Sequence, residues 1–124
     1  MSKMVGLFKN ETNVRTIEVG KTLFEAGEPG TCMYVLRGGR LGVTVNGVTV
    51  ETVEPGGVVG EMSLIDEAPR SATVVALADS EVVPVDHRRF LFLVQQTPFF
   101  ALEVMRLMAD RLRAMNARMP VAGA

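Results

Sequence analysis

The sequence predicts a mainly β domain, an antiparallel, jelly-roll-like β-roll followed by two C-terminal α-helices. Short Val- and Thr-rich runs, separated by Gly, Pro and Asn, recur up to about residue 86. No helical stretch of ten residues lies between them, which favours an antiparallel roll over a parallel sheet. Beyond them the apolar residues change to a helical period. We therefore expect one domain over 1–124, with the β-roll at about 12–86 and the helices at about 87–118.

Length and composition limit the class of protein. The chain has 124 residues, 48% of them hydrophobic, which suits one globular domain with a core. Its net charge of −1 provides no general positive field for nucleic acid. Apolar runs such as 91–94 are far shorter than the roughly 20 residues that cross a bilayer. Residues 1–10 lack the apolar centre of a signal peptide, so we expect a cytoplasmic protein without a membrane segment.

The strands are expected where aliphatic and β-branched residues cluster. Asn46-Gly47 predicts a type I′ hairpin, because both residues tolerate a positive φ. Gly38-Gly39 predicts a second hairpin. The expected strands cover residues 14–19, 22–25, 32–36, 41–45, 48–53, 73–78 and 81–85.

Two helices are expected to close the chain. Asp86 can cap a helix that ends near Gln95, and Thr97-Pro98 is a suitable N-cap and first residue for the next one. The second helix carries an apolar stripe with heptad spacing. It consists of Ala101, Met105, Met108, Leu112, Met115 and Met119. The stripe can pack on the domain's own roll, or it can form a dimer seam or a movable lid, because methionine adapts to surfaces that repack.

The segment 59–74 interrupts the strand pattern and suits a ligand site. A helical turn beginning after Gly60 offers unpaired backbone N–H groups, and glycine allows a ligand to approach closely. Arg70 provides a fork of donors for phosphate oxygens, whereas Glu61 only accepts and so fits a sugar hydroxyl. Together they suggest a ribose phosphate. A surface ion pair between Glu61 and Arg70 would explain the same residues.

The same segment resembles the phosphate-binding cassette of cyclic-nucleotide-binding domains. The resemblance rests on Gly60-Glu61, a hydrophobe and a small residue, followed by Pro-Arg-Ser-Ala-Thr at 69–73. Stretches 22–30, 33–36 and 38–45 are similar to the family's early strands. This family includes the bacterial catabolite activator, the regulatory subunits of protein kinase A and cyclic-nucleotide-gated channels.

The resemblance implies a role for each cassette residue. Arg70 would pair with the cyclic phosphate, Glu61 would accept from the ribose 2′-OH, and amides near Ser63 and Ser71 would hold the other phosphate oxygens. Val59 departs from the family pattern, which often has an aromatic residue before the glycine. The implied ligand-binding residues are Gly60, Glu61, Met62, Ser63, Arg70, Ser71 and Ala72.

The resemblance also implies a regulatory sensor that transmits occupancy through its C-terminal helices. Cyclic AMP is favoured over cyclic GMP because the cassette generally resembles those of bacterial members of the family, although Ser71 is compatible with both. Arg106, Arg111, Arg113 or a stripe methionine could cover the base, but the ordinary explanation of each is a solvated helix face or a core residue, and none is assigned this role. The alternative is a ligand-free interaction or dimerisation module of the same fold.

The sequence lacks the residues and segments that metal-dependent, catalytic or DNA-binding functions need. His87 is the only histidine and Cys32 the only cysteine, so we expect no metal centre, no catalytic dyad, no enzyme activity and no cofactor. Few residues follow Met119, so we expect no DNA-binding helix-turn-helix module in this chain. A fragment of a larger regulator, channel or enzyme is equally compatible with the sequence. The expected partners are the cyclic nucleotide and either an unidentified protein or a second copy bound through the last helix.

Overall fold

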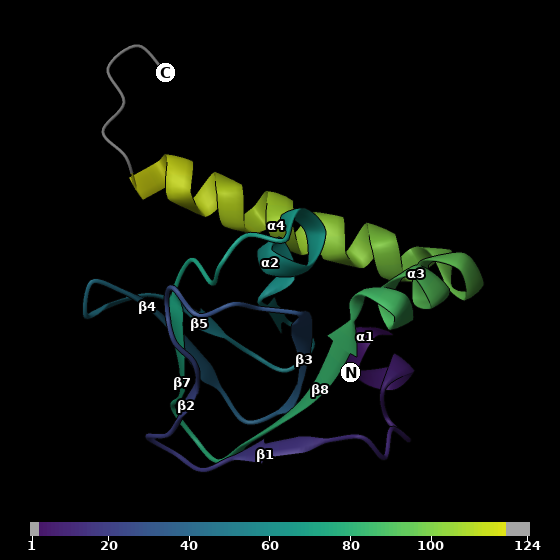
Figure 1. The fold of residues 1–124 in the computed structure, drawn as a ribbon, viewed down its shortest axis with the longest axis horizontal. Coiled ribbons are helices and arrows are strands. Elements are labelled where there is room, and N and C mark those ends of the chain that lie inside the picture. Colours follow the sequence, from purple (N-terminus) through teal and green to yellow (C-terminus); the bar gives the residue numbers. More distant parts are fainter. Residues whose placement is uncertain (1–2, 119–124) are drawn as a thin grey trace.

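A computed structural model describes residues 3–118 and has eight strands in a β-roll, with helices gathered along one side (Figure 1). The strands form two antiparallel four-stranded sheets, in the orders β1-β8-β3-β6 and β2-β7-β4-β5. The predicted antiparallel roll is therefore confirmed. The strands are β1 (Arg15–Ile17), β2 (Thr22–Phe24), β3 (Cys32–Gly38), β4 (Leu41–Val45), β5 (Val48–Val53), β6 (Val58–Val59), β7 (Thr73–Ala76) and β8 (Ser80–Asp86).

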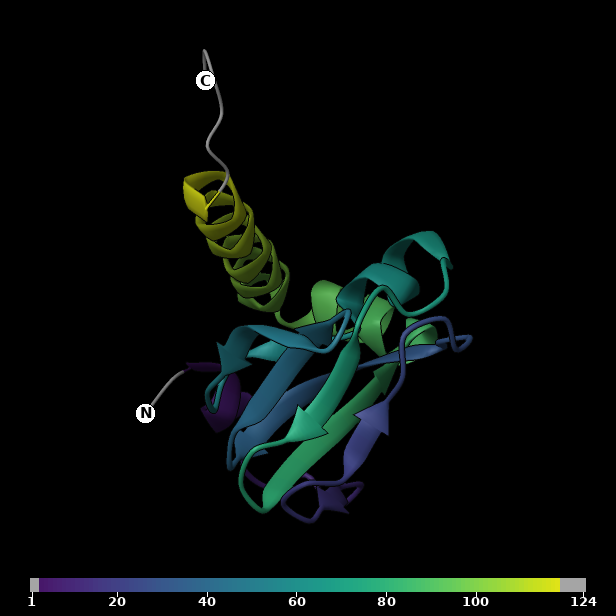
Figure 2. The same cartoon turned by 90° about the vertical axis from the view of Figure 1, so that its left-hand side faces the viewer.

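The described part of the chain, residues 3–118, contains four helices: α1 (Lys3–Leu7), α2 (Glu61–Asp66), α3 (His87–Gln96) and α4 (Pro98–Arg118). The two predicted C-terminal helices are confirmed, and the Asp86 carboxylate caps α3 by accepting from the Arg89 amide at 2.8 Å. Helix α4 crosses above the roll and its C-terminal end projects away from it (Figures 1 and 2).

The hairpin at Asn46-Gly47 is confirmed. It joins the paired strands β4 and β5, and Asn46 and Gly47 have φ values of 51° and 79°.

The predicted hairpin at Gly38-Gly39 is wrong. Strand β3 pairs with β6 and β8, whereas β4 pairs with β5 and β7, so the chain passes from one sheet to the other here. Gly39 has a φ of 94°, and a Cβ at this position would lie 2.5 Å from the Asp79 carbonyl oxygen. Glycine is therefore needed for a tight corner against a neighbouring loop.

Two short elements are not predicted by the sequence. Strand β6 has only two residues and directly follows Pro55-Gly56-Gly57, so no strand pattern is visible there. Its Val59 pairs with Tyr34 of β3, which places Gly60 and α2 at the edge of a sheet. Helix α1 has only five residues, too few to show a helical period.

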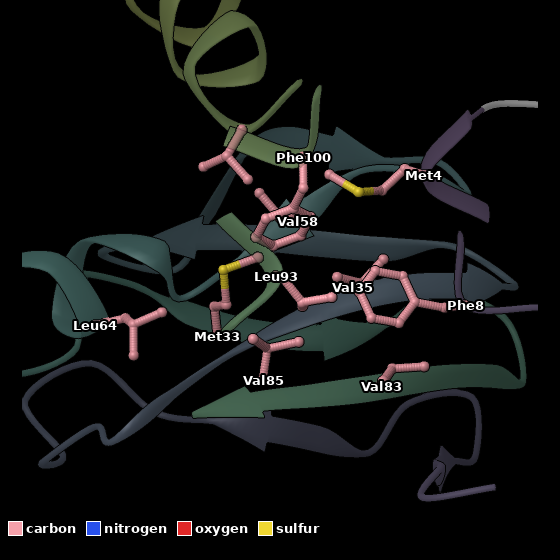
Figure 3. Close-up of a cluster of buried hydrophobic side chains, with 11 residues drawn as sticks. Met4, Phe8, Met33, Val35, Val58, Leu64, Val83, Val85, Leu93 and Phe100 are labelled. Atoms are coloured by element: carbon pink, nitrogen blue, oxygen red, sulfur yellow. The ribbon is translucent and has the colours of Figure 1, made fainter. Parts of the chain in front are cut away.

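Strand β3 lies between two hydrophobic cores, because its side chains alternate. Met33 and Val35 face the helices, whereas Tyr34 and Leu36 lie between the sheets. Figure 3 shows the helix-side core. Its buried residues are Met4, Phe8, Met33, Val35, Val58, Leu64, Val83, Val85, Leu93, Phe100 and Val104.

Phe100 anchors the start of α4 in that core. Its ring meets Phe8 after α1 at 6.2 Å and Phe90 of α3 at 5.5 Å, both edge to face. Because Phe100 is fully buried, it packs the first turn of α4 into the helix-side core.

The apolar stripe of α4 lies mostly outside the contact between α4 and the helix-side core. Met105, Leu112 and Met115 are 55%, 59% and 52% exposed, while Ala101 and Met108 are half-buried. The prediction that the stripe is buried against the domain's own roll is therefore wrong for Met105, Leu112 and Met115. The stripe residue Met119 lies outside the described residues.

Candidate functional site

A cavity of about 960 Å³ lies between the roll, the α2 segment and helix α4. Its volume is at the upper end of the range of small-molecule sites. Strand β5 and the inner face of α4 complete its walls. Every residue predicted to bind the ligand lines it, namely Gly60, Glu61, Met62, Ser63, Arg70, Ser71 and Ala72. Their contact with a ligand stays a prediction.

Gly60 sets the geometry at the start of α2. Its φ is 80°, a left-handed conformation that glycine adopts without strain. A Cβ at Gly60 would overlap Nη1 of Arg70 and lie 3.3 Å from the Cys32 carbonyl oxygen. Any larger residue would therefore displace the arginine from its position in the cavity wall.

Arg70 is a buried cation held by its backbone to a neighbouring loop. Its amide donates to the Glu28 carbonyl and its own carbonyl accepts from the Gly27 amide, each at 2.8 Å. The residue is only 6% exposed, and Nη1 donates to the Gly60 carbonyl at 3.2 Å. Within residues 3–118, Nε has no hydrogen-bond partner and no carboxylate forms an ion pair with the guanidinium.

This state of Arg70 is unusual, because buried charges are normally paired. An unsatisfied buried donor costs roughly 1–3 kcal/mol or more. An anionic ligand in the cavity would supply the missing charge and acceptors. The arrangement is therefore suited to binding an anion.

Glu61, the first residue of α2, is only 2% exposed and pairs with Arg111 of α4. The ion pair between Glu61 and Arg70 that the sequence left open is therefore not formed, and the glutamate is not a surface residue. An ionised carboxylate has about four acceptor sites, so one cationic partner leaves capacity for a ligand hydroxyl.

Arg111 connects helix α4 to the roll at three points. Besides Glu61, its Nη2 donates to the Val58 carbonyl of β6 at 2.9 Å. Its Nε lies 2.7 Å from the Glu51 carboxylate of β5, although the angle is too poor for a hydrogen bond. Charge attraction therefore acts there without a directed bond.

The sequence predicted Arg111 as a candidate only together with Arg106 and Arg113. Arg106 lines the cavity but binds Glu103 at 2.7 Å, and exposed Arg113 binds Asp110 at 3.0 Å. The distinguishing signal is helical spacing. Val104, Leu107 and Arg111 are separated by three and four residues, which places Arg111 on the buried face of α4, where an arginine needs acidic partners.

The remaining predicted residues form the rim and the floor. Met62 is 51% exposed and Ser71 is exposed, whereas Ser63 and Ala72 are buried. The stripe methionine Met115 also lines the cavity, so α4 supplies an apolar surface there.

Tyr34 lies near Arg70 but provides no counter-charge. Burial, together with a hydrogen bond to Cys32, raises the pKa of the Tyr34 hydroxyl, and the opposing charges of Arg15 and Arg70 do not reverse this. The phenol therefore stays neutral at physiological pH, and its hydroxyl accepts from Arg15 Nη1 at 3.4 Å.

Elsewhere in residues 3–118 no group of three or more potential metal ligands is present, and His87 is exposed at the start of α3. Over the same residues no helix is long and apolar enough to span a bilayer.

The roll and its cavity have the form of a domain suited to binding an anionic small molecule. A family model described as "Cyclic nucleotide-binding domain" matches residues 14–97. The chain belongs to the cyclic nucleotide-binding domain family.

Named relatives agree with this assignment. The chain is 33% identical, over 76% of its length, to the "Cyclic AMP receptor protein" of Thermus thermophilus. The crystal structure of Thermus thermophilus Catabolite Activator Protein superposes on 94% of this chain with a TM-score of 0.76 and 30% identity. A structure described as "A cyclic-GMP-dependent signalling pathway regulates bacterial phytopathogenesis" covers 90% of this chain, with a TM-score of 0.73 and 28% identity.

The length covered differs among these relatives. The chain spans 46% of the Thermus thermophilus receptor protein and 57% of the activator chain in the crystal structure. It covers 94% of the third protein's chain.

Proposed function

We propose that this domain binds cyclic AMP in the cavity beside Arg70 and acts as a regulatory sensor rather than an enzyme. The observation that supports it best is the buried Arg70 guanidinium, which has no carboxylate partner within residues 3–118. A cyclic phosphate carries one negative charge and oxygens that suit a guanidinium fork.

The second polar group of the cavity fits the rest of the ligand. Buried Glu61 has acceptor capacity for the ribose 2′-OH. The preference for cyclic AMP is supported by the similarity to a "Cyclic AMP receptor protein", while another similar structure is described in connection with a cyclic-GMP-dependent signalling pathway. A comparison of both nucleotides is therefore part of any binding test.

Occupancy would reach α4 through Arg111. A ligand shifts a conformational equilibrium only by making different contacts in the two states. A ribose hydroxyl that donates to Glu61 would change the acceptor that Arg111 now uses. Because Thr97-Pro98 separates α3 from α4, the junction can serve as a hinge for the response.

The output would be a change in protein binding. The exposed part of the stripe, Met105, Leu112 and Met115, is available for a second copy of the chain or for another protein. This surface also favours the alternative function, a dimerisation module that binds no ligand.

Thermal unfolding with cyclic AMP distinguishes the two functions. A ligand present at a hundred times its Kd stabilises the native state by about 2.7 kcal/mol. We expect the melting temperature to rise with the cyclic AMP concentration. An unchanged melting temperature with millimolar cyclic AMP and with cyclic GMP would favour the ligand-free module.

A further inference from the structure

The guanidinium of Arg70 lies against two aromatic rings. Its Cζ is 4.2 Å from the centre of the Phe24 ring and 5.8 Å from that of Tyr34. The two rings stack on each other, with centres 6.1 Å apart and planes inclined by 26°. Phe24 and Tyr34 are 7% and 9% exposed, so the cation and both rings are shielded from water.

Gly30 lies on another side of the Arg70 guanidinium. A Cβ at Gly30 would lie 2.5 Å from both Cζ and Nε of Arg70. The guanidinium therefore occupies space that only a glycine leaves open. With its Nη1 bound to the Gly60 carbonyl, the group is restricted from several directions before any ligand arrives.

Burial of apolar surface does not by itself require an aromatic residue at position 24. Phe24 belongs to the core between the sheets, where an aliphatic side chain would also bury apolar surface. A leucine, however, has no π-face with which to attract a cation. The attraction matters here because, among residues 3–118, no carboxylate pairs with Arg70.

We propose that Phe24, supported by Tyr34, is a positioning residue for Arg70, which holds the guanidinium ready for an anionic phosphate. This inference rests on the proposed function, since the phosphate is that of the cyclic nucleotide. The ring stabilises the cation while the cavity is empty and limits its orientation. The Phe24 ring should therefore strengthen the binding of a negatively charged ligand more than that of a neutral one, because it acts through the Arg70 guanidinium, which binds the charge.

Two probes measure this dependence: cyclic AMP and its neutral methyl phosphotriester. The variants are Phe24→Leu, which removes the π-face, and Phe24→Tyr, which keeps it. Phe8→Leu is the matched control, because Phe8 is also buried with an arginine over its ring, Arg89 at 5.5 Å, but lies outside the cavity lining.

We expect Phe24→Leu to weaken cyclic AMP binding by roughly tenfold, the size expected from a desolvated cation–π contact. Binding of the neutral triester should change much less, so the preference for the charged probe falls. Phe24→Tyr should restore the preference, and Phe8→Leu should leave it unchanged. Equal losses for both probes in Phe24→Leu, or no loss at all, would overturn the proposal.

A measurement without ligand separates this proposal from the proposed function. In the free wild-type protein, the ring current of Phe24 should shift the Arg70 Nε–H proton resonance upfield, and Phe24→Leu should abolish the shift. An unshifted resonance in the wild type overturns the positioning role even if cyclic AMP binds. If the resonance is shifted but the protein binds neither probe, the contact between the Phe24 ring and Arg70 is supported. The proposed function is then overturned instead.

Discussion

Glu61 at the start of α2 and Arg111 in α4 form a largely buried ion pair between residues 50 positions apart in the sequence. The Glu61 side chain is 3% exposed and the Arg111 side chain 24%. The pair connects the wall of the cavity to the helix that carries the exposed apolar stripe. It therefore gives α4 a direct contact with the candidate binding site.

Replacing Arg111 by leucine should destabilise the domain, because Glu61 would remain buried without a cation. Breaking one side of a buried pair costs about 3 kcal/mol. Chemical denaturation measures the loss in the free energy of unfolding. Arg113→Leu on the same helix is the matched control, since Arg113 is 74% exposed and its loss should cost about 0.5 kcal/mol or less. Equal costs in the two variants would show that the Glu61 contact does not stabilise α4 on the roll.

Binding of cyclic AMP should change α4 as well as the cavity wall. Amide hydrogen exchange is expected to differ between free and bound protein over residues 98–118, because Arg111 would share Glu61 with the proposed ligand. Strands β3 and β8, in the centre of one sheet, serve as the internal reference. If protection changes only around residues 60–72, the domain binds its ligand without a switch.

The stripe on α4 predicts self-association. Leu112→Glu should raise the dissociation constant of a homodimer by at least about tenfold, because it places a charge within the apolar contact. Leu91→Glu is the control, since Leu91 is 54% exposed on α3, outside the stripe. Sedimentation equilibrium measures both variants. A wild-type protein that stays monomeric at millimolar concentration would contradict the homodimer and leave a different protein as the partner.

The segment after α1 should contribute an acid-sensitive part of the stability. A hydrogen bond from Arg89 holds the pKa of the Glu11 carboxyl below its ordinary value, and Asn13 and Thr12 add smaller effects in the same direction. A lowered folded-state pKa means that the ionised form stabilises the fold above the unfolded pKa of about 4.3.

That contribution is lost as the pH falls through the folded pKa. Glu11→Gln should therefore lower the free energy of unfolding by about 1 kcal/mol or less at pH 7. The wild-type and variant stabilities should converge at low pH. A difference that stays constant from pH 7 to pH 2 would show that the carboxylate's charge is not responsible.

Local patterns predicted most of the fold. The seven predicted strands are all present, and none of their ends differs from the prediction by more than two residues. Turn chemistry was decisive at Asn46-Gly47, where both residues have positive φ. The same reasoning predicted a hairpin wrongly at Gly38-Gly39. Glycine is needed there because of the loop at Asp79, which is distant in sequence and which no local pattern reveals.

The site was predicted only in part, for a similar reason. The cassette residues lie close together in the sequence, and all of them line the cavity. Arg111 and Phe24 lie far from the cassette in sequence, and only tertiary packing brings them to Glu61 and Arg70. Glu51 likewise reaches Arg111 only through the position of β5.

The most direct test of the account is a calorimetric titration of cyclic AMP into the wild-type domain, Arg70→Leu and the control Arg88→Leu. Charge-assisted hydrogen bonds contribute about 1.5–3 kcal/mol each, so the wild type should reach micromolar affinity and Arg70→Leu should lose it by about 100-fold or more. Because Arg70 is a buried cation without a carboxylate partner within residues 3–118, its replacement should not lower the ligand-free stability by more than about 1 kcal/mol. Arg88, exposed on α3, should be replaceable without effect on either quantity. Unchanged affinity in a folded Arg70→Leu protein would contradict the assignment of the phosphate to Arg70, and so would the absence of binding by the wild type.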